Sequence, residues 1–366
     1  MTNQFNRHIV LDVARFVAIL FVMLFHYYSC WAYRGDATYP YGALYDYFSW
    51  GHLGVEFFFI LTGFFIIPSL QRSDSFAIFL KKKFVRLGIP LVLCSIITFV
   101  IFKVFDNDGF IPSSSQFRNF LVSCQLVSPN VFNLLFNTDL QYINHSYWFL
   151  WVELQFLILV SVVYFVDKSH FLRNISVVSF VFCTIWYVSR RLIENYFLTN
   201  KLGIPFSEES MLYAKDWLWT FNLPMYMFYM EFGMICSFIH KRDFKSCLWL
   251  IPLIGVSLIN NSLFTYSVEH VICWGIVGVW LLYVLIGLRT ELFGGGALFF
   301  AKIGEASYAA YLLHEYIGIL IIHKYAYLFE KQMWVLPVIL ILIMFTASYC
   351  GYKYIEKPLT KILLSK

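Results

Sequence analysis

Arg15 and His26 both lie in the first apolar stretch of the sequence, which runs from Ile9 to Tyr28. An ionisable side chain near the centre of a bilayer costs roughly 2.5–3.5 kcal/mol on insertion scales, so such residues are rare and commonly functional. At about 100° per residue, their spacing brings both side chains to one helix face, separated by ~16 Å of rise. We therefore expect one buried polar track, with a cation at one end and an imidazole at the other.

Two carboxylates and a second histidine occur in later apolar stretches: Glu56, Glu153 and His314. A carboxylate beside an imidazole holds the ring in one tautomer and raises its basicity, which is what a general base needs. We predict a catalytic set that comprises His26, Glu56, Glu153 and His314, with Glu56 or Glu153 orienting His26. The alternative is that the four side chains form buried hydrogen bonds that only specify helix packing.

The composition identifies the class of protein that must position these residues. Hydrophobic residues make up 60% of the 366 residues and charged residues 13%, with a mean hydropathy of +0.68. Soluble domains carry roughly 25% charged residues, so a soluble globular protein is excluded. The sequence predicts an all-α integral membrane protein, and the net charge of +5 does not require a nucleic-acid partner.

Apolar windows of about 20 residues predict a bundle of about ten transmembrane helices. Lys and Arg are concentrated in the connections on the side of the N-terminus, which places both termini in the cytoplasm. No internal repeat or appended soluble domain is visible, so residues 1–366 form a single membrane domain. The predicted spans are 9–29, 50–70, 84–105, 146–166, 174–190, 217–239, 247–263, 269–288, 300–323 and 334–355.

This topology assigns a depth to each polar residue. Arg15 falls near the cytoplasmic face, whereas His26, Glu56 and Glu153 fall in the outer half and His314 near the middle. The longest connection, 106–145, is external, and its apolar pieces predict short helices that lie against the membrane. This segment either covers a site or forms a structural lid without ligand contact.

Cysteine and histidine spacing gives little indication of a disulfide or a metal. The eight cysteines include no C-x-x-C pair and are interpreted as small buried hydrophobes, with an external Cys30–Cys124 disulfide as the alternative. His26, His314, Glu56 and Glu153 could form a ligand set, but no two histidines stand at helical ligand spacing, so we expect no metal.

Six motifs follow one another along nearly the whole chain, and the first joins Leu11-Asp12-Val-Ala-Arg15 to His26. The others are 54–64 around Glu56, Lys83-Phe-Val-Arg86, Trp148 to Glu153, 304–314 and Tyr354-Ile-Glu356-Lys-Pro358. Their order and spacing resemble those of the acyltransferase-3 family of multipass membrane acyltransferases. Three positions depart from the family pattern: Lys83 replaces an arginine, Thr62 replaces a serine, and Phe149 stands where serine is usual.

The resemblance implies transfer of an acyl group, commonly acetyl from acetyl-CoA, to a hydroxyl of a bacterial cell-surface carbohydrate or its lipid-linked precursor. The location implied is the bacterial inner membrane, and glycan-assembly proteins or a partner transferase are the macromolecular partners to expect. By position, Arg15 and His26 match the first-span pair of the family, and Arg86 matches the second arginine of its basic motif. Arg15, Lys83 and Arg86 are therefore predicted to bind the phosphates of acyl-CoA, although Lys83 lacks the bidentate fork of arginine.

Two questions stay open at this stage. Transfer could be direct, with His26 as general base, or could pass through an acyl-enzyme, for which Ser307 is the nearest nucleophile by motif. A transporter or flippase of a lipid-linked sugar is the rival class, because 21% aromatic residues offer many stacking faces for sugars. Against it, the paired inverted repeats common in transporters are not found. A membrane scaffold without catalysis would leave the buried charges unexplained.

Overall fold

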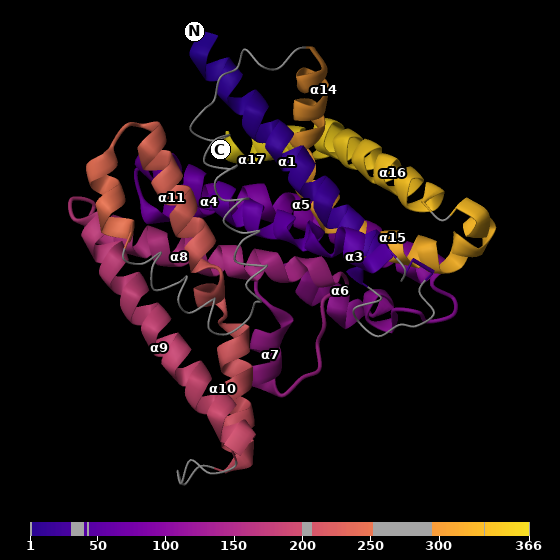
Figure 1. Ribbon diagram of the computed structural model, residues 1–366, viewed down its shortest axis with the longest axis horizontal. Coiled ribbons are helices and arrows are strands. Elements are labelled where there is room, and N and C mark those ends of the chain that lie inside the picture. The colour runs from indigo at the N-terminus through magenta and orange to yellow at the C-terminus, as the bar shows by residue number, and fades with distance from the viewer. Residues whose placement is uncertain are drawn as a thin grey trace.

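The computed structural model describes residues 2–30, 40–41, 44–199, 207–251, 295–332 and 334–365. All regular structure within these residues is helical, which confirms the predicted all-α class. The main helices are α1 Thr2–Tyr28, α4 Leu53–Gln71, α5 Phe76–Phe105, α8 Trp148–Val166, α9 Phe171–Thr199, α10 Glu208–Thr220, α11 Met227–His240, α14 Gly295–Gly304, α15 Ser307–Tyr325, α16 Val335–Gly351 and α17 Lys357–Leu364 (Figure 1). Shorter elements are α3 Tyr45–Phe48, η2 Ser49–His52, η3 Pro112–Ser115, α6 Phe117–Ser123, α7 Pro129–Phe136, η4 His145–Tyr147, η5 Leu223–Met225, η7 Ala326–Gln332 and η8 Tyr352–Glu356.

Six helical segments in the described residues are long and apolar enough to cross a membrane. They correspond to the first five predicted spans and the last one. Predicted span 269–288 and most of span 247–263 lie outside the described residues, so the count of ten spans and the location of the termini remain predictions. The six segments are Ile9–Tyr28, Asp46–Gln71, Phe76–Phe105, His145–Val166, Phe171–Phe197 and Val335–Leu364.

Two predicted spans are divided in the structure. Span 217–239 is broken because α10 ends at Thr220 and α11 begins at Met227, with Pro224 in the intervening η5. Proline has no backbone N–H and is favoured in the first turn of a helix, which is the position that Pro224 takes in η5. Span 300–323 is divided between α14 and α15 at residues 305–306, after Gly304.

Helix α4 forms part of the centre of the bundle and packs against α1, α8 and α11. Its sequence is apolar on every side, which is the pattern of a helix surrounded by protein or lipid. A Cβ on Gly63 would collide with the carbonyl of Met230, and a Cβ on Gly233 would collide with the carbonyl of Ile60. The α4 and α11 backbones therefore touch through paired glycines, as is common where membrane helices cross closely.

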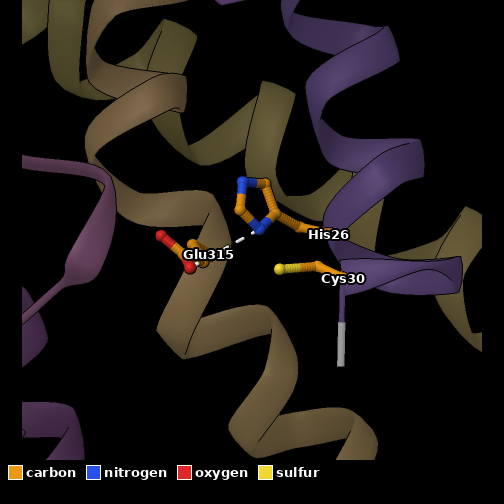
Figure 2. Close-up of side chains that lie close together, drawn as sticks. All are labelled: His26, Cys30 and Glu315. Carbon is orange, nitrogen blue, oxygen red and sulfur yellow. Dashed lines mark ion pairs between the residues drawn. The ribbon is translucent and has the colours of Figure 1, made fainter. Parts of the chain in front are cut away.

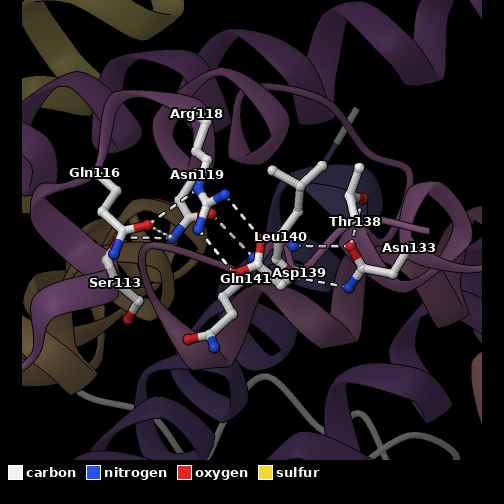
Figure 3. Close-up of polar contacts among 9 residues, drawn as sticks. All are labelled: Ser113, Gln116, Arg118, Asn119, Asn133, Thr138, Asp139, Leu140 and Gln141. Carbon is white, nitrogen blue, oxygen red and sulfur yellow. Dashed lines mark hydrogen bonds and ion pairs between the residues drawn. The ribbon is translucent and has the colours of Figure 1, made fainter. Parts of the chain in front are cut away.

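The connection 106–145 folds into an ordered layer, and the predicted short helices are present as α6 and α7. Asparagine side chains bond its turns together (Figure 3). Asn119 accepts from the backbone N–H of Gln141 at 3.0 Å and donates to the Ser113 carbonyl at 3.1 Å. Asn133 accepts from the Leu140 N–H at 2.8 Å and donates to its carbonyl at 2.9 Å. Each amide replaces a backbone partner that these irregular turns lack.

Asp108 fastens this layer to the far end of α15. Its carboxylate accepts from Lys324 at 2.9 Å and lies 3.0 Å from His323 Nε2. These bonds to Lys324 and His323 hold the pKa of Asp108 well below its usual range. The layer ends at Asn144 and His145, which lead directly into α8.

Candidate active site

His26 at the C-terminal end of α1 and Glu315 in the middle of α15 lie within ion-pair distance of each other (Figure 2). The distance from His26 Nδ1 to Glu315 Oε1 is 3.5 Å, and the two side chains are 11% and 0% exposed. A carboxylate held at Nδ1 favours the tautomer with the proton on Nδ1, which leaves Nε2 as the basic nitrogen. The pair therefore has the composition of an oriented general base.

A second imidazole faces the same carboxylate oxygen. His145 Nδ1 lies 3.7 Å from Glu315 Oε1, and its side chain is 50% exposed. His145 enters from η4, at the end of the layer formed by 106–145, whereas His26 enters from α1. Glu315 is thus shared by a buried histidine and a half-exposed one.

His314 lies beside His26, and its ring contacts a backbone carbonyl rather than a carboxylate. Its ring centre is 4.9 Å from that of His26, at an interplanar angle of 66°. His314 Nδ1 lies 2.7 Å from the Tyr311 carbonyl. A carbonyl only accepts, so the proton is on Nδ1 and Nε2 carries a lone pair. That Nε2 is buried and has no hydrogen-bond partner among the described residues, so it is available to a bound molecule.

Three side chains, one from α1 and two from the η4 segment, bind carbonyls in one turn of α15. The Tyr27 hydroxyl donates to the carbonyl of His314 at 3.0 Å, and the Asn144 amide donates to the carbonyl of Leu312 at 2.8 Å. Ser146 Oγ donates to the Tyr311 carbonyl at 3.4 Å. We call these three donors the α15 clamp. It fixes α1 and η4 relative to α15, and so it fixes the spacing of His26, Glu315 and His145.

Glu153 belongs to a different group, formed by α4, α5 and α8. Thr62 Oγ1 donates to Glu153 Oε1 at 3.1 Å, so the threonine at this position supplies a hydroxyl to the carboxylate. Glu153 also interacts electrostatically with Lys83, whose ammonium lies 5.6 Å from the centre of the Phe79 ring. The predicted residue Glu153 therefore lies within electrostatic range of a predicted donor-binding cation.

Glu56 is buried in the first turn of α4, and its Oε2 has no hydrogen-bond partner among the described residues. Two residues further along α4, the centre of the Phe58 ring lies 6.0 Å from that of Tyr311. The turn of α4 that carries Glu56 is therefore beside the part of α15 that carries Glu315. The carboxylate that lies within ion-pair distance of the His26 ring is that of Glu315.

Arg15 makes a short ion pair with Asp12, one turn earlier in α1. The guanidinium carbon of Arg15 is 5.2 Å from the centre of the Phe65 ring, and its side chain is 31% exposed. Lys83 is half-buried and Arg86 is exposed. All three predicted donor-binding residues therefore reach a surface, which an acyl-CoA site requires.

His26, Cys30 and Glu315 also form a set that could hold a metal ion, because one ligand atom from each lies within 4.8 Å of the others. His26 and Cys30 are four residues apart, a ligand spacing that a search for histidine pairs overlooks. A metal bound here would be coordinated by the His26 nitrogen and the Glu315 carboxylate. These groups could not then act together as a general base and the carboxylate that orients it. The absence of a metal remains a prediction. No disulfide joins Cys30 and Cys124 in the described residues.

Sequence reasoning missed three ionisable residues, His145, Glu231 and Glu315, and it quoted Asp12 in a motif without giving it a role. Glu315 directly follows His314 in a predicted span. A carboxylate inside an apolar span is unusual, and this could have identified Glu315 as a candidate from the sequence. His145 directly precedes the Ser146-Tyr147-Trp148 stretch. Glu231 is 1% exposed on α11 and lies beside Ser179 of α9.

Comparison with known proteins relates this arrangement to acyl transfer. The family model described as acyltransferase domain matches residues 8–353. The chain is 38% identical over 97 residues to the O-acetyl transferase of Shigella phage Sf6, an alignment that covers 26% of this chain and 27% of that relative. The match thus spans about a quarter of the relative's length. No solved structure matches the chain. Because the family model spans all the helices that carry the site residues, this chain belongs to the acyltransferase-3 family.

Proposed function

We propose that this protein is an O-acyltransferase of the bacterial inner membrane. It moves an acyl group, in the first instance acetyl, from acyl-CoA to a hydroxyl of a cell-surface carbohydrate or its lipid-linked precursor. The observation that carries the proposal is the buried His26–Glu315 pair in a chain of the acyltransferase-3 family. The likeness to a phage protein described as an O-acetyl transferase supports oxygen as the acceptor atom.

In the proposed reaction, His26 is the general base. Glu315 holds the Nδ1 proton, and Nε2 takes the proton of the acceptor hydroxyl as its oxygen attacks the thioester carbonyl. The carbon–sulfur bond breaks when the tetrahedral intermediate collapses, and the leaving CoA thiolate receives the proton from His26. Direct transfer of this kind requires no acyl-enzyme. Ser307, the nucleophile suggested by motif, is the first residue of α15 and is buried.

On the donor side, Arg15, Lys83 and Arg86 are proposed to bind the phosphates of acyl-CoA. Asp12 aims the Arg15 guanidinium, and Glu153 with Thr62 balances the charge of Lys83. The ~16 Å of helix rise between Arg15 and His26 would be spanned by the extended pantetheine arm. Glu56 and His314 are proposed to line the acyl and acceptor positions near Tyr311.

The test of the proposed function is mass spectrometry of surface glycans from the native bacterium, the deletion strain, and the deletion strain carrying the wild-type gene. We expect an acyl mass to disappear from one sugar in the deletion strain and to return on complementation. Unchanged acylation together with missing or mislocated glycan would instead identify a transporter of a lipid-linked sugar and overturn the proposal.

Replacement of Glu315 by glutamine should lower the transfer rate by about 10²-fold, because an amide can no longer hold the imidazolium that forms on His26. Acyl-CoA turnover in membranes, followed by release of free thiol, measures the loss. Glu231→Gln is the matched control, since it makes the same change at an equally buried carboxylate on α11. A Glu315→Gln variant with the wild-type rate would remove Glu315 from the mechanism.

Replacement of Arg15 by alanine should raise the KM for acetyl-CoA by about 10- to 100-fold, the range expected for loss of a charge-assisted hydrogen bond to phosphate. Arg15→Lys should recover only part of the affinity, since the ammonium lacks the bidentate fork. The measurement is initial rate against acetyl-CoA concentration. Arg173→Ala is the control, because Arg173 is an exposed arginine whose recorded bonds are to Asn174. An unchanged KM in Arg15→Ala would show that Arg15 does not bind the donor.

A further inference from the structure

His145 is the half-exposed member of the cluster around Glu315. Its side chain is 50% exposed, compared with 11% for His26 and 0% for Glu315. It belongs to the layer formed by 106–145, which ends at η4, rather than to a long helix of the bundle. A molecule that approaches the buried pair from this side would meet His145 first.

The two histidines present the same nitrogen to one carboxylate oxygen. His26 Nδ1 and His145 Nδ1 lie 3.5 Å and 3.7 Å from Glu315 Oε1. In an imidazole the Nε2 atom lies on the far side of the ring from Nδ1, so the Nε2 atoms of both rings point away from Glu315. One carboxylate therefore orients two nitrogens, one buried and one near the surface.

The backbone that carries His145 is held rigidly. The Asn144 side chain accepts from the Ser146 N–H at 3.3 Å and donates to the Leu312 carbonyl at 2.8 Å. Ser146 adds its bond to the Tyr311 carbonyl. Two members of the α15 clamp are thus the immediate neighbours of His145 in sequence. A side chain placed this way is preorganised, which is typical of a binding residue and unusual for a free surface histidine.

We propose that His145 binds the acceptor, with its Nε2 hydrogen-bonded to a second hydroxyl of the sugar whose neighbouring hydroxyl gives its proton to His26. This inference rests on the proposed function and assigns the acceptor class as a polyol that offers two hydroxyls to two imidazoles. Glu315 then fixes the distance between the two contacts. No covalent step is added, because the proton moves only between the acceptor, His26 and the leaving thiolate.

The experiment measures initial rates of acetyl transfer in membranes, with acetyl-CoA and glycan purified from the deletion strain as the acceptor. In His145→Ala, we expect the KM for the glycan to rise about tenfold, the loss of one hydrogen bond to a hydroxyl. The kcat and the KM for acetyl-CoA should stay within about threefold of wild type. His145→Gln, which keeps a hydrogen-bonding group, should recover part of the affinity and serves as the second variant if the alanine variant does not fold.

His170→Ala is the matched control, because His170 is also an exposed histidine paired with a carboxylate, Asp167, at 2.9 Å. A fall in kcat with an unchanged KM for the glycan would assign His145 to the positioning of Glu315 and overturn the proposal, as would no change in either parameter. Failure of the proposed function is distinguishable, since wild-type membranes would then transfer no acetyl group to the glycan.

Discussion

Replacement of His26 by alanine is expected to lower acyl transfer by about 10² to 10⁴-fold, the usual contribution of a general base. The protein should still insert and fold, because the α15 clamp uses Tyr27, Asn144 and Ser146 and does not use the His26 ring. The loss should appear in kcat, with the KM for acetyl-CoA little changed, since Arg15 lies about 16 Å away along the helix.

The measurement is complementation of the deletion strain, read as the acylated fraction of its glycan by mass spectrometry, together with thiol release in membranes. His52→Ala is the matched control. His52 is a half-buried histidine whose recorded bond is to the Ser49 carbonyl at 2.7 Å, and its ring lies 5.6 Å from that of Phe25, the neighbour of His26. Wild-type acylation by the His26→Ala variant would contradict the proposed mechanism. An equal loss in His26→Ala and His52→Ala would indicate a disturbed fold.

The second large effect is expected on folding, from Gly63→Val. A valine side chain cannot occupy the α4–α11 crossing unless the two backbones separate, because even a Cβ would collide with the Met230 carbonyl. The cost should exceed the ~3 kcal/mol at the top of the range for overpacked cores, since a backbone cannot move aside as a side chain can. We expect loss of most of the folded protein.

The measurement is size-exclusion chromatography of a fluorescent fusion in mild detergent, which compares the height and shape of the monodisperse peak. Gly88→Val is the matched control: it makes the same substitution inside α5, where a Cβ would meet no heavy atom within 4 Å among the described residues. A full monodisperse peak for Gly63→Val would show that the close approach of α4 and α11 is not required for the fold.

The long helices could be predicted from the sequence because a bilayer demands about 20 apolar residues in a row. Spans such as 84–105 and 146–166 carry that signal by themselves, and both lie within helices of the structure. Hydropathy is an average over a window, however, and it does not register a single Pro224 or the residues between Gly304 and Ser307. The two divided helices were missed for this reason.

The candidate site was predictable as a set of residue types but not as a set of partners. His26 stood out because it is an ionisable residue in an apolar span, and that signal depends on the residue alone. Its pairing with Glu315 depends on how α1 turns against α15, which the bond from Tyr27 to the His314 carbonyl fixes. His314 and Glu315 are adjacent in sequence, so their side chains point about 100° apart around the helix. Which of the two faces His26 depends on how the helices pack, and the sequence does not show that.

The α15 clamp is made entirely to main-chain carbonyls, those of Tyr311, Leu312 and His314. Every amino acid presents the same carbonyl, so substitutions on α15 can change the side chains that face the substrate while the three donors continue to hold the helix in place. Mutational tolerance should therefore be asymmetric. The clamp requires the side chains of Tyr27, Asn144 and Ser146. It places no requirement on the side chains of the α15 residues whose carbonyls accept these bonds. Acceptor specificity could diverge among relatives through α15 without a new way of assembling the site.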